Sequence, residues 1–263
     1  MAQPPDRNPA DPWRHLTAAT PARIALGRAG GSLPTREVLR FALAHARARD
    51  AVHADFDSRT LADMLRAEGL VTVDATSRAA DRAAYLRRPD WGRDLSEASR
   101  AVLKPDGAAG ELVVAVADGL SATAVEAHAV PLVKALRPLL EKMGIPLSSA
   151  VIATGARVAL GDAIGQALGA QAVLVLIGER PGLSSPDSLG AYLTFDARPG
   201  RMDSERNCVS NIRPEGLPVE AAALRLGWLI GEAFRRRLTG VALKDESEAL
   251  PAAPADPSLS PHG

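Results

Sequence analysis

A run of six apolar residues at positions 172–177, Ala-Val-Leu-Val-Leu-Ile, constrains the fold of this chain more than any other stretch. Branched and straight aliphatic residues without a polar interruption predict a strand that is buried on both faces, as in parallel sheets. The run leads into residues 178–182, Gly-Glu-Arg-Pro-Gly, which form a charged loop flanked by glycines. Because ligands of open α/β sheets bind beyond the carboxyl ends of the strands, this loop is either a binding edge or a surface turn.

The second half of the chain alternates apolar runs with helical periodicity. Strands are expected at 112–117, 147–153, 171–177 and 191–195, and helices at 122–143, 158–168 and 218–238. Ser121 is placed to cap the first of these helices, and Pro131 is expected to kink it. Alternation of strands and helices builds parallel βαβ units, so we predict an α/β fold with a Rossmann-like, mostly parallel sheet flanked by helices.

A smaller, mainly helical region precedes the sheet domain. Helical spacing of apolar residues begins at Thr35, shorter helices are expected at 61–70 and 95–103, and residues 71–73 form an edge strand or a turn. Residues 85–93 combine Arg, Asp, Tyr and Trp, a mixture that is enriched at protein interfaces. We therefore divide the chain into a disordered tail (1–22), a helical region (23–106), an α/β domain (107–243) and a second disordered tail (244–263).

The composition argues against several classes of function. Formal net charge is zero and 3% of residues are aromatic, whereas a nucleic-acid binder would show a basic stripe with interleaved aromatics. Cys208 is the single cysteine, which excludes an internal disulfide and fits a reducing compartment. The five histidines show no metal-ligand spacing, and no apolar run is long enough to cross a bilayer. We therefore expect no metal site, no nucleic acid and no membrane.

The chain carries no motif for self-sufficient catalysis. It has neither a Gly-x-Ser-x-Gly nucleophile elbow nor a Gly-x-Gly-x-x-Gly turn after the first strand of the sheet domain. The missing glycine turn speaks against a stand-alone NAD(P)- or flavin-dependent oxidoreductase, the alternative enzyme for such a sheet. Cys208 is open to two interpretations, an inert small residue or a ligand contact. Polar strand ends on a rigid sheet suit a protein that holds a large ligand without transforming it.

Several short blocks of residues, from about Arg23 to Lys244, match one known family and follow one another in the same order as in that family. In the helical region they are Gly27-Arg28-Ala29-Gly30, Thr35, Leu39-Arg40-Phe41, His45, Asp50, Tyr85-Leu86, Arg88-Pro89-Asp90 and Gly92-Arg93. In the sheet domain they are Asp118-Gly119-Leu120-Ser121, Arg157-Val158, Gly178-Glu179-Arg180-Pro181-Gly182-Leu183, Cys208, Ser210-Asn211-Ile212 and Val219-Glu220-Ala221-Ala222. Each block alone is weak, but together they resemble the small subunit of ethanolamine ammonia-lyase, an adenosylcobalamin-dependent enzyme.

The resemblance implies a non-catalytic partner in a hetero-oligomeric lyase. In that family a large TIM-barrel subunit binds ethanolamine and carries the residues that convert it, by a radical reaction, to acetaldehyde and ammonia. Adenosylcobalamin lies between the subunits, and the family's small-subunit contacts to it map onto Val158, Glu179 and Cys208. A corrin is an apolar disc fringed with neutral amides, so an apolar contact, a hydrogen-bond acceptor and a small weakly polar group suit it.

The helical region is assigned to the interface with the large subunit. Arg28, Arg88 and Asp90 are the residues that we expect at this interface. A scaffold that joins large subunits without touching the cofactor remains an alternative. Several relatives have a longer, amphipathic N-terminus suited to packing into a protein-shelled microcompartment, whereas here it is short and proline-bearing, so we expect a cytoplasmic protein rather than an encapsulated one.

Overall fold

The apolar run at 172–177 forms the central strand β4 (Ala172–Gly178) of the computed structural model, and every residue of β4 is buried. The structure describes residues 11–105, 112–147 and 149–247. On one side β4 pairs in parallel with β2 (Leu112–Ala117), which is also buried throughout. On its other side β4 pairs with β5 (Leu189–Phe195), which runs in the opposite direction. The prediction of a strand buried on both faces is therefore confirmed.

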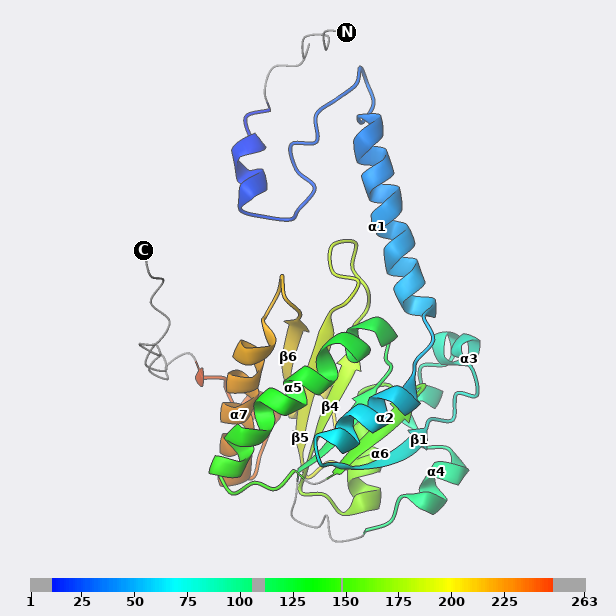
Figure 1. Ribbon diagram of the computed structural model, residues 1–263, viewed down its shortest axis with the longest axis vertical. Coiled ribbons are helices and arrows are strands. Elements are labelled where there is room, and N and C mark those ends of the chain that lie inside the picture. The colour runs from blue at the N-terminus through cyan, green and yellow to red at the C-terminus, as the bar shows by residue number, and fades with distance from the viewer. Residues whose placement is uncertain (1–10, 106–111, 148, 248–263) are drawn as a thin grey trace.

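The six strands form one mixed sheet in the order β1-β3-β2-β4-β5-β6 (Figure 1). The edge strand β1 (Val71–Thr76) and the strand β3 (Ser149–Thr154) are parallel to β2 and β4. The other edge strand, β6 (Asn207–Ile212), is antiparallel to β5. An α/β fold with a mostly parallel, Rossmann-like arrangement is confirmed, although β5 reverses. The connection between β4 and β5 is a short loop, whereas a parallel crossover needs a dozen residues or more.

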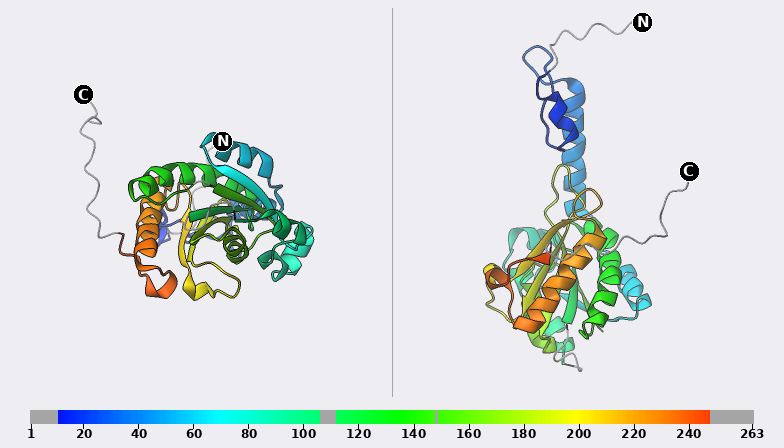
Figure 2. Two further views of the ribbon diagram at one scale, coloured as in Figure 1. Left: turned by 90° about the horizontal axis from the view of Figure 1, so that it is seen from below. Right: turned by 90° about the vertical axis from the view of Figure 1, so that its left-hand side faces the viewer.

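Helices cover both faces of the sheet, as Figure 2 shows. One face packs against α2 (Ser58–Ala67), α5 (Ala122–Lys142) and α7 (Val219–Arg236) in the larger apolar core. The other face, called the α6 face below, packs against α6 (Leu160–Leu168) and against the segment that carries α3 (Arg82–Arg87) and α4 (Glu97–Val102). This second core is the smaller of the two. At the carboxyl ends of the parallel strands it extends as far as Ala117, Ala153 and Ile177.

The predicted helices are present with shifted ends. The Ser121 hydroxyl accepts a hydrogen bond from the Ala124 amide at 3.3 Å and so caps α5, as expected, and α5 continues through Pro131. The polar segment that includes Cys208 forms β6, which the sequence analysis did not expect. Its alternation of buried and exposed residues is irregular, because the register with β5 shifts between Leu189 and Ala191.

The long helix α1 (Thr35–His53) projects away from the sheet (Figures 1 and 2). A single residue of this helix, Ala51, is buried. Residues 11–34 fold back beside its far end and include the short 3-10 helix η1 (Arg14–Ala18). Three further 3-10 turns are η2 (Trp91–Arg93), η3 (Asp203–Glu205) and η4 (Gly240–Ala242).

The described residues cover only part of the predicted domain limits. The boundary predicted between residues 106 and 107 lies outside them, as do residues 1–10 and 248–263 of the predicted tails. Of the remaining tail residues, 14–18 form η1, and the Asp245 carboxylate pairs with Arg225 at 3.1 Å. No helix among the described residues is long and apolar enough to span a membrane.

Candidate functional site

The carboxyl end of β2 is tied to that of β3 by one buried carboxylate. Asp118 follows β2 directly and is 6% exposed. Its oxygens accept hydrogen bonds from the backbone amides of Gly119 at 2.9 Å and of Gly155 and Ala156 at 3.0 Å. Burial raises the pKa of Asp118 above its ordinary value, and these amides oppose that shift only in part. Asp118 therefore fixes the relative position of two strand ends at the predicted binding edge.

Arg82 joins the same strand ends to the base of α1. Its Nη1 lies 3.6 Å from the Asp118 carboxylate and donates to the Gly119 carbonyl at 2.7 Å. Its Nε donates to the Val52 carbonyl, in the last turn of α1, at 2.8 Å. The guanidinium also lies over the ring of Tyr85, 4.8 Å from its centre. One side chain from α3 thus connects the projecting helix to the sheet.

The turn between β3 and α6 presents Val158 on the α6 face. Gly155 in this turn has φ +68°, and a Cβ there would lie 2.9 Å from the Ser77 hydroxyl, so glycine is required. The Arg157 guanidinium stacks 4.3 Å from the centre of the Tyr85 ring, and its buried Nε has no hydrogen-bond partner. Val158 is half-buried against the apolar core of the α6 face.

Glu179 joins the three strands β4, β5 and β6 at their common edge. Its Oε2 accepts a hydrogen bond from the Ser188 hydroxyl at 2.5 Å and from the Asn211 amide at 3.2 Å. Its Oε1 accepts one from the Ser210 hydroxyl. A carboxylate has about four acceptor positions, so Oε1 of this half-buried side chain retains capacity for one further donor.

Cys208 lies next to this carboxylate on the α6 face. It pairs across β5 and β6 with Tyr192, which in turn pairs with Val175 of β4. The residue is exposed to solvent, yet the protein atoms around its sulfur raise the pKa of the thiol. A hydrogen bond with the Tyr192 hydroxyl opposes this rise, and the negative charge of Glu179 adds to it. Burial likewise raises the pKa of Tyr192.

A glycine makes this arrangement possible. A Cβ on Gly190 would lie 3.0 Å from Glu179 Oε1 and 3.0 Å from Cε2 of Tyr192. Both side chains reach their positions across the bare backbone of Gly190 on β5. We call Glu179, Ser188, Tyr192, Cys208 and Ser210 the Glu179 cluster.

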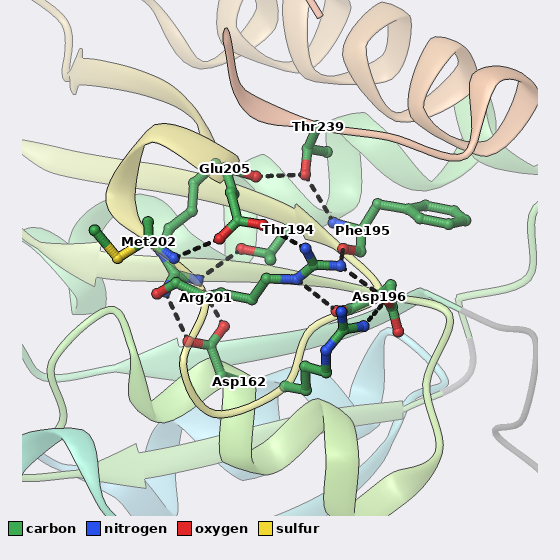
Figure 3. A network of polar contacts seen from close by, with 10 residues as sticks. Asp162, Thr194, Phe195, Asp196, Arg201, Met202, Glu205 and Thr239 are labelled. Carbon is green, nitrogen blue, oxygen red and sulfur yellow. Dashed lines mark hydrogen bonds and ion pairs between the residues drawn. The ribbon is translucent and has the colours of Figure 1, made fainter. Parts of the chain in front are cut away.

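A second polar network holds the loop that leads into β6. Figure 3 shows Arg201 between Asp196 and Glu205, with Thr239 closing the far side. Arg206 lies deeper and makes two hydrogen bonds to the Asp162 carboxylate of α6, at 2.6 and 2.7 Å, and one to the Thr194 hydroxyl at 3.0 Å. This network ties Arg206, the residue before β6, to α6.

The structure therefore brings two of the three predicted cofactor-contacting residues together directly. Glu179 and Cys208 belong to one cluster, and Val158 lies on the same face of the sheet at the beginning of α6. Tyr192 and the ion pair of Asp162 with Arg206 were missed. No local motif marks them, because they meet only through strand pairing and through a contact between residues 44 positions apart. The described residues hold no group of histidine, cysteine and carboxylate side chains arranged for a metal ion.

Comparisons with known proteins agree on one family. Residues 10–244 match the family model described as ethanolamine ammonia-lyase light chain. A Bradyrhizobium diazoefficiens protein is 58% identical over 242 residues, which cover 91% of this chain and 92% of that protein. A Rhodopseudomonas palustris protein is 56% identical over 251 residues (95% and 96%), and a Pseudomonas fluorescens protein is 48% identical over 265 residues (98% and 96%). All three are named ethanolamine ammonia-lyase small subunit.

Proposed function

Because this chain belongs to the ethanolamine ammonia-lyase light-chain family, we propose that it forms one wall of an adenosylcobalamin site and works only together with a large catalytic subunit. The reaction of the complex is the conversion of ethanolamine to acetaldehyde and ammonia. The large subunit, a TIM barrel, binds ethanolamine and carries the catalytic residues. We place the complex in the cytoplasm. The observation that carries the proposal is the Glu179 cluster, which opens to solvent on a rigid sheet edge.

The residues of this edge fit a corrin. A corrin needs apolar contact and hydrogen-bond acceptors for its amide groups rather than a strongly basic pocket. Val158 offers a half-buried aliphatic surface, and Oε1 of Glu179 retains an acceptor position. Arg157, the residue before Val158, has a buried Nε without a hydrogen-bond partner, so one donor of this side chain is unsatisfied at the edge of the proposed site. When bound, adenosylcobalamin supplies the radical chemistry of the reaction.

The side chains of this wall bind and orient rather than react. Glu179 is held by three hydrogen bonds, two from β6 and one from the residue before β5, so its carboxylate is fixed before any ligand arrives. The Cys208 thiol, with its raised pKa, stays protonated at neutral pH and acts as a small, weakly polar contact. Ser188 and Ser210 are positioning residues, because they direct the Glu179 carboxylate and have no other role in the proposal.

The helical region, residues 23–106, supplies the interface with the large subunit. Arg88 and Asp90 form an exposed ion pair with Nη2 of Arg88 2.5 Å from the carboxylate, and the Arg88 guanidinium lies 4.4 Å from the centre of the Trp91 ring. An exposed Arg stacked on a half-buried Trp is typical of interface hot spots. Arg28 is assigned to the same interface. Replacement of these residues is expected to impair assembly more than folding.

Reconstitution tests the proposal. The purified chain, the purified large subunit and adenosylcobalamin are mixed, and ammonia release from ethanolamine is measured. We expect full activity only when all three are present. A large subunit that reaches the full rate alone would overturn the proposal.

A Glu179→Ala variant separates a cofactor wall from a scaffold. If the chain is only a scaffold that joins large subunits, the variant keeps its cobalamin affinity. If the chain forms a wall of the site, the free energy of cobalamin binding becomes weaker by about 1–3 kcal/mol, because an amide of the cofactor is left unpaired. Cobalamin binding to the assembled complex is followed by equilibrium dialysis. Arg198→Ala is the control, because Arg198 pairs with Asp196 at the opposite edge of the sheet. Equal affinities of the two variants would favour the scaffold.

A further inference from the structure

The projecting helix α1 carries an apolar stripe whose large side chains are at least half exposed. Val38, Leu39 and Leu43 are 50%, 64% and 53% exposed. With Ala42 and Ala46 they recur at the three- and four-residue spacing that places side chains on one face of a helix. We call these five residues the α1 stripe. Figures 1 and 2 show this helix standing clear of the sheet and its covering helices.

The N-terminal segment packs on the other side of α1 and leaves the stripe open. Glu37, whose side chain is only 10% exposed, pairs there with Arg36 and Arg40. The Arg23 guanidinium lies 5.7 Å from the centre of the Phe41 ring and donates to the Leu183 carbonyl at 3.4 Å. These contacts hold residues 11–34 and the β4–β5 loop against one face of the helix. Leu43, at the edge of the stripe, borders a hollow with Leu183 and Pro186 of that loop, whereas Val38 and Leu39 lie on the open face.

The remaining parts of the chain are poor candidates to cover the stripe. Residues 1–10 and 248–263 are dominated by Pro, Ala, Asp and Ser. Their large apolar side chains are limited to Met1, Leu250 and Leu259. A stripe with three large aliphatic residues needs a matching apolar surface, and the sequence of these segments does not provide one.

The charge around the stripe indicates what kind of partner fits. Residues 11–53 hold seven arginines and three acidic side chains, although the whole chain has a formal net charge of zero. Arg47 follows one edge of the stripe, and Arg36 and Arg40 lie further round on the same flank, where they pair with Glu37. A second copy of the same helix would bring arginines against arginines, which is unfavourable. An apolar groove with an acidic rim complements the stripe and its flank.

We propose that the α1 stripe docks into an apolar, acid-rimmed groove on the large subunit, as an amphipathic helix docks into a partner's groove. This inference rests on the proposed function, which supplies the large subunit as the partner. Arg82 connects the last turn of α1 to Asp118 at the sheet edge. Docking of the helix therefore sets where the cofactor wall lies relative to the catalytic subunit.

Introduction of a charge into the stripe tests the proposal. Leu39→Glu and Leu43→Glu are prepared in the full chain, and their dissociation constants for the purified large subunit are measured by sedimentation velocity. We expect each variant to bind at least about tenfold more weakly, as for a central interface residue. The matched control is Leu224→Glu, because Leu224 is 56% exposed on α7 at the other side of the sheet, and it should bind like wild type. Unchanged binding by both stripe variants, with wild-type thermal melts, overturns the inference.

Two further measurements identify the occupant. Binding of wild type should weaken as salt is raised, and Arg47→Glu should weaken it at low salt, because the groove is acidic. Self-association of the chain alone that Leu39→Glu abolishes would overturn the inference in favour of a second copy. If Arg88→Ala weakens assembly while both stripe variants assemble normally, the inference fails and the proposed function stands. If wild type does not bind the large subunit at all, both fail.

Discussion

Arg206 and Asp162 form a two-point ion pair whose side chains are 3% and 2% exposed, between the beginning of β6 and the first turn of α6. Asp162 lies in a helix N-terminal turn, where a carboxylate is favoured by the helix dipole. The loop between β5 and β6 is therefore fixed by a buried contact to the Asp162 carboxylate, which Figure 3 draws as part of the polar network. The position of Cys208, two residues beyond Arg206, depends on this pair.

Removal of the Asp162 carboxylate should lower the free energy of unfolding more than removal of any charge on the surface. In Asp162→Ala the guanidinium of Arg206 stays buried and loses its buried counter-charge, keeping only the exposed Asp203 carboxylate 3.7 Å from its Nε, and we expect a loss of about 3–5 kcal/mol in the free energy of unfolding. Urea denaturation followed by circular dichroism measures this loss. Arg198→Ala is the matched control, because the pair of Arg198 with Asp196 is exposed and is expected to contribute less than about 1 kcal/mol. Similar losses in the two variants would show that the buried pair is not a structural anchor.

The reactivity of Cys208 should report on the Glu179 cluster. Burial raises the pKa of its thiol above the ordinary value of 9.0, so alkylation by iodoacetamide should become fast only in alkaline solution. Glu179→Gln removes a negative charge that raises this pKa, so its profile should move to lower pH. Tyr192→Phe removes a hydrogen bond that lowers the pKa, so its profile should move to higher pH. Since Cys208 is the single cysteine, mass spectrometry of the alkylated chain measures one site.

The same reaction tests whether Cys208 belongs to the cofactor wall. In the assembled complex, adenosylcobalamin should protect Cys208 from alkylation at a pH at which the free complex reacts. Complex without the cofactor is the control for protection by the large subunit alone. Equal rates with and without the cofactor would remove Cys208 from the wall.

Gly190→Ala should damage the Glu179 cluster without a direct contact to the cofactor. The added methyl group would lie 3.0 Å from both Glu179 Oε1 and the Tyr192 ring, so one of these side chains must move. We expect cobalamin affinity of the assembled complex to fall by about 1 kcal/mol or more, comparable to the loss of one hydrogen bond. Gly31→Ala is the control, because no atom lies within 4 Å of a Cβ built there. Unchanged affinity in Gly190→Ala would mean that the orientation of Glu179 does not matter for binding.

The central strands of the sheet could be predicted because an unbroken apolar run in the local sequence indicates a strand that is buried on both faces. The apolar runs of β2 and β4 are buried throughout, so their sequence carries the signal of a strand in the middle of a sheet. β6 could not be predicted in this way. Its side chains alternate irregularly between core and solvent, and its pairing with β5 is set by long-range contacts such as that of Arg206 with Asp162.

The candidate site was predictable only in its parts. The sequence places Glu179 after an apolar strand, and this position alone predicts the edge of the sheet at which it lies. That Ser188, Ser210 and the Asn211 amide converge on its carboxylate depends on the reversal of β5, which turns its first residues back to the end of β4. Cys208 was assigned by family resemblance, since a lone cysteine on an unpredicted strand has no local signal.

Arg82→Ala should loosen the junction between α1 and the sheet, in a manner that depends on pH. Burial raises the pKa of Asp118 above 3.8, so the folded chain holds this proton to higher pH than the unfolded chain does. Ionisation of Asp118 therefore costs stability as pH rises through that window, and Arg82 reduces this cost because its charge opposes the shift. Loss of Arg82 should consequently destabilise the fold by about 1–3 kcal/mol near neutral pH and by less at about pH 4, where a larger fraction of Asp118 is protonated. Urea denaturation at the two pH values measures the difference. Arg78→Ala, which removes an exposed pair with Asp94, is the control and should show no such pH dependence. An equal loss of unfolding free energy at both pH values in Arg82→Ala would mean that Arg82 acts through the carbonyls of Val52 and Gly119 and not through the charge of Asp118.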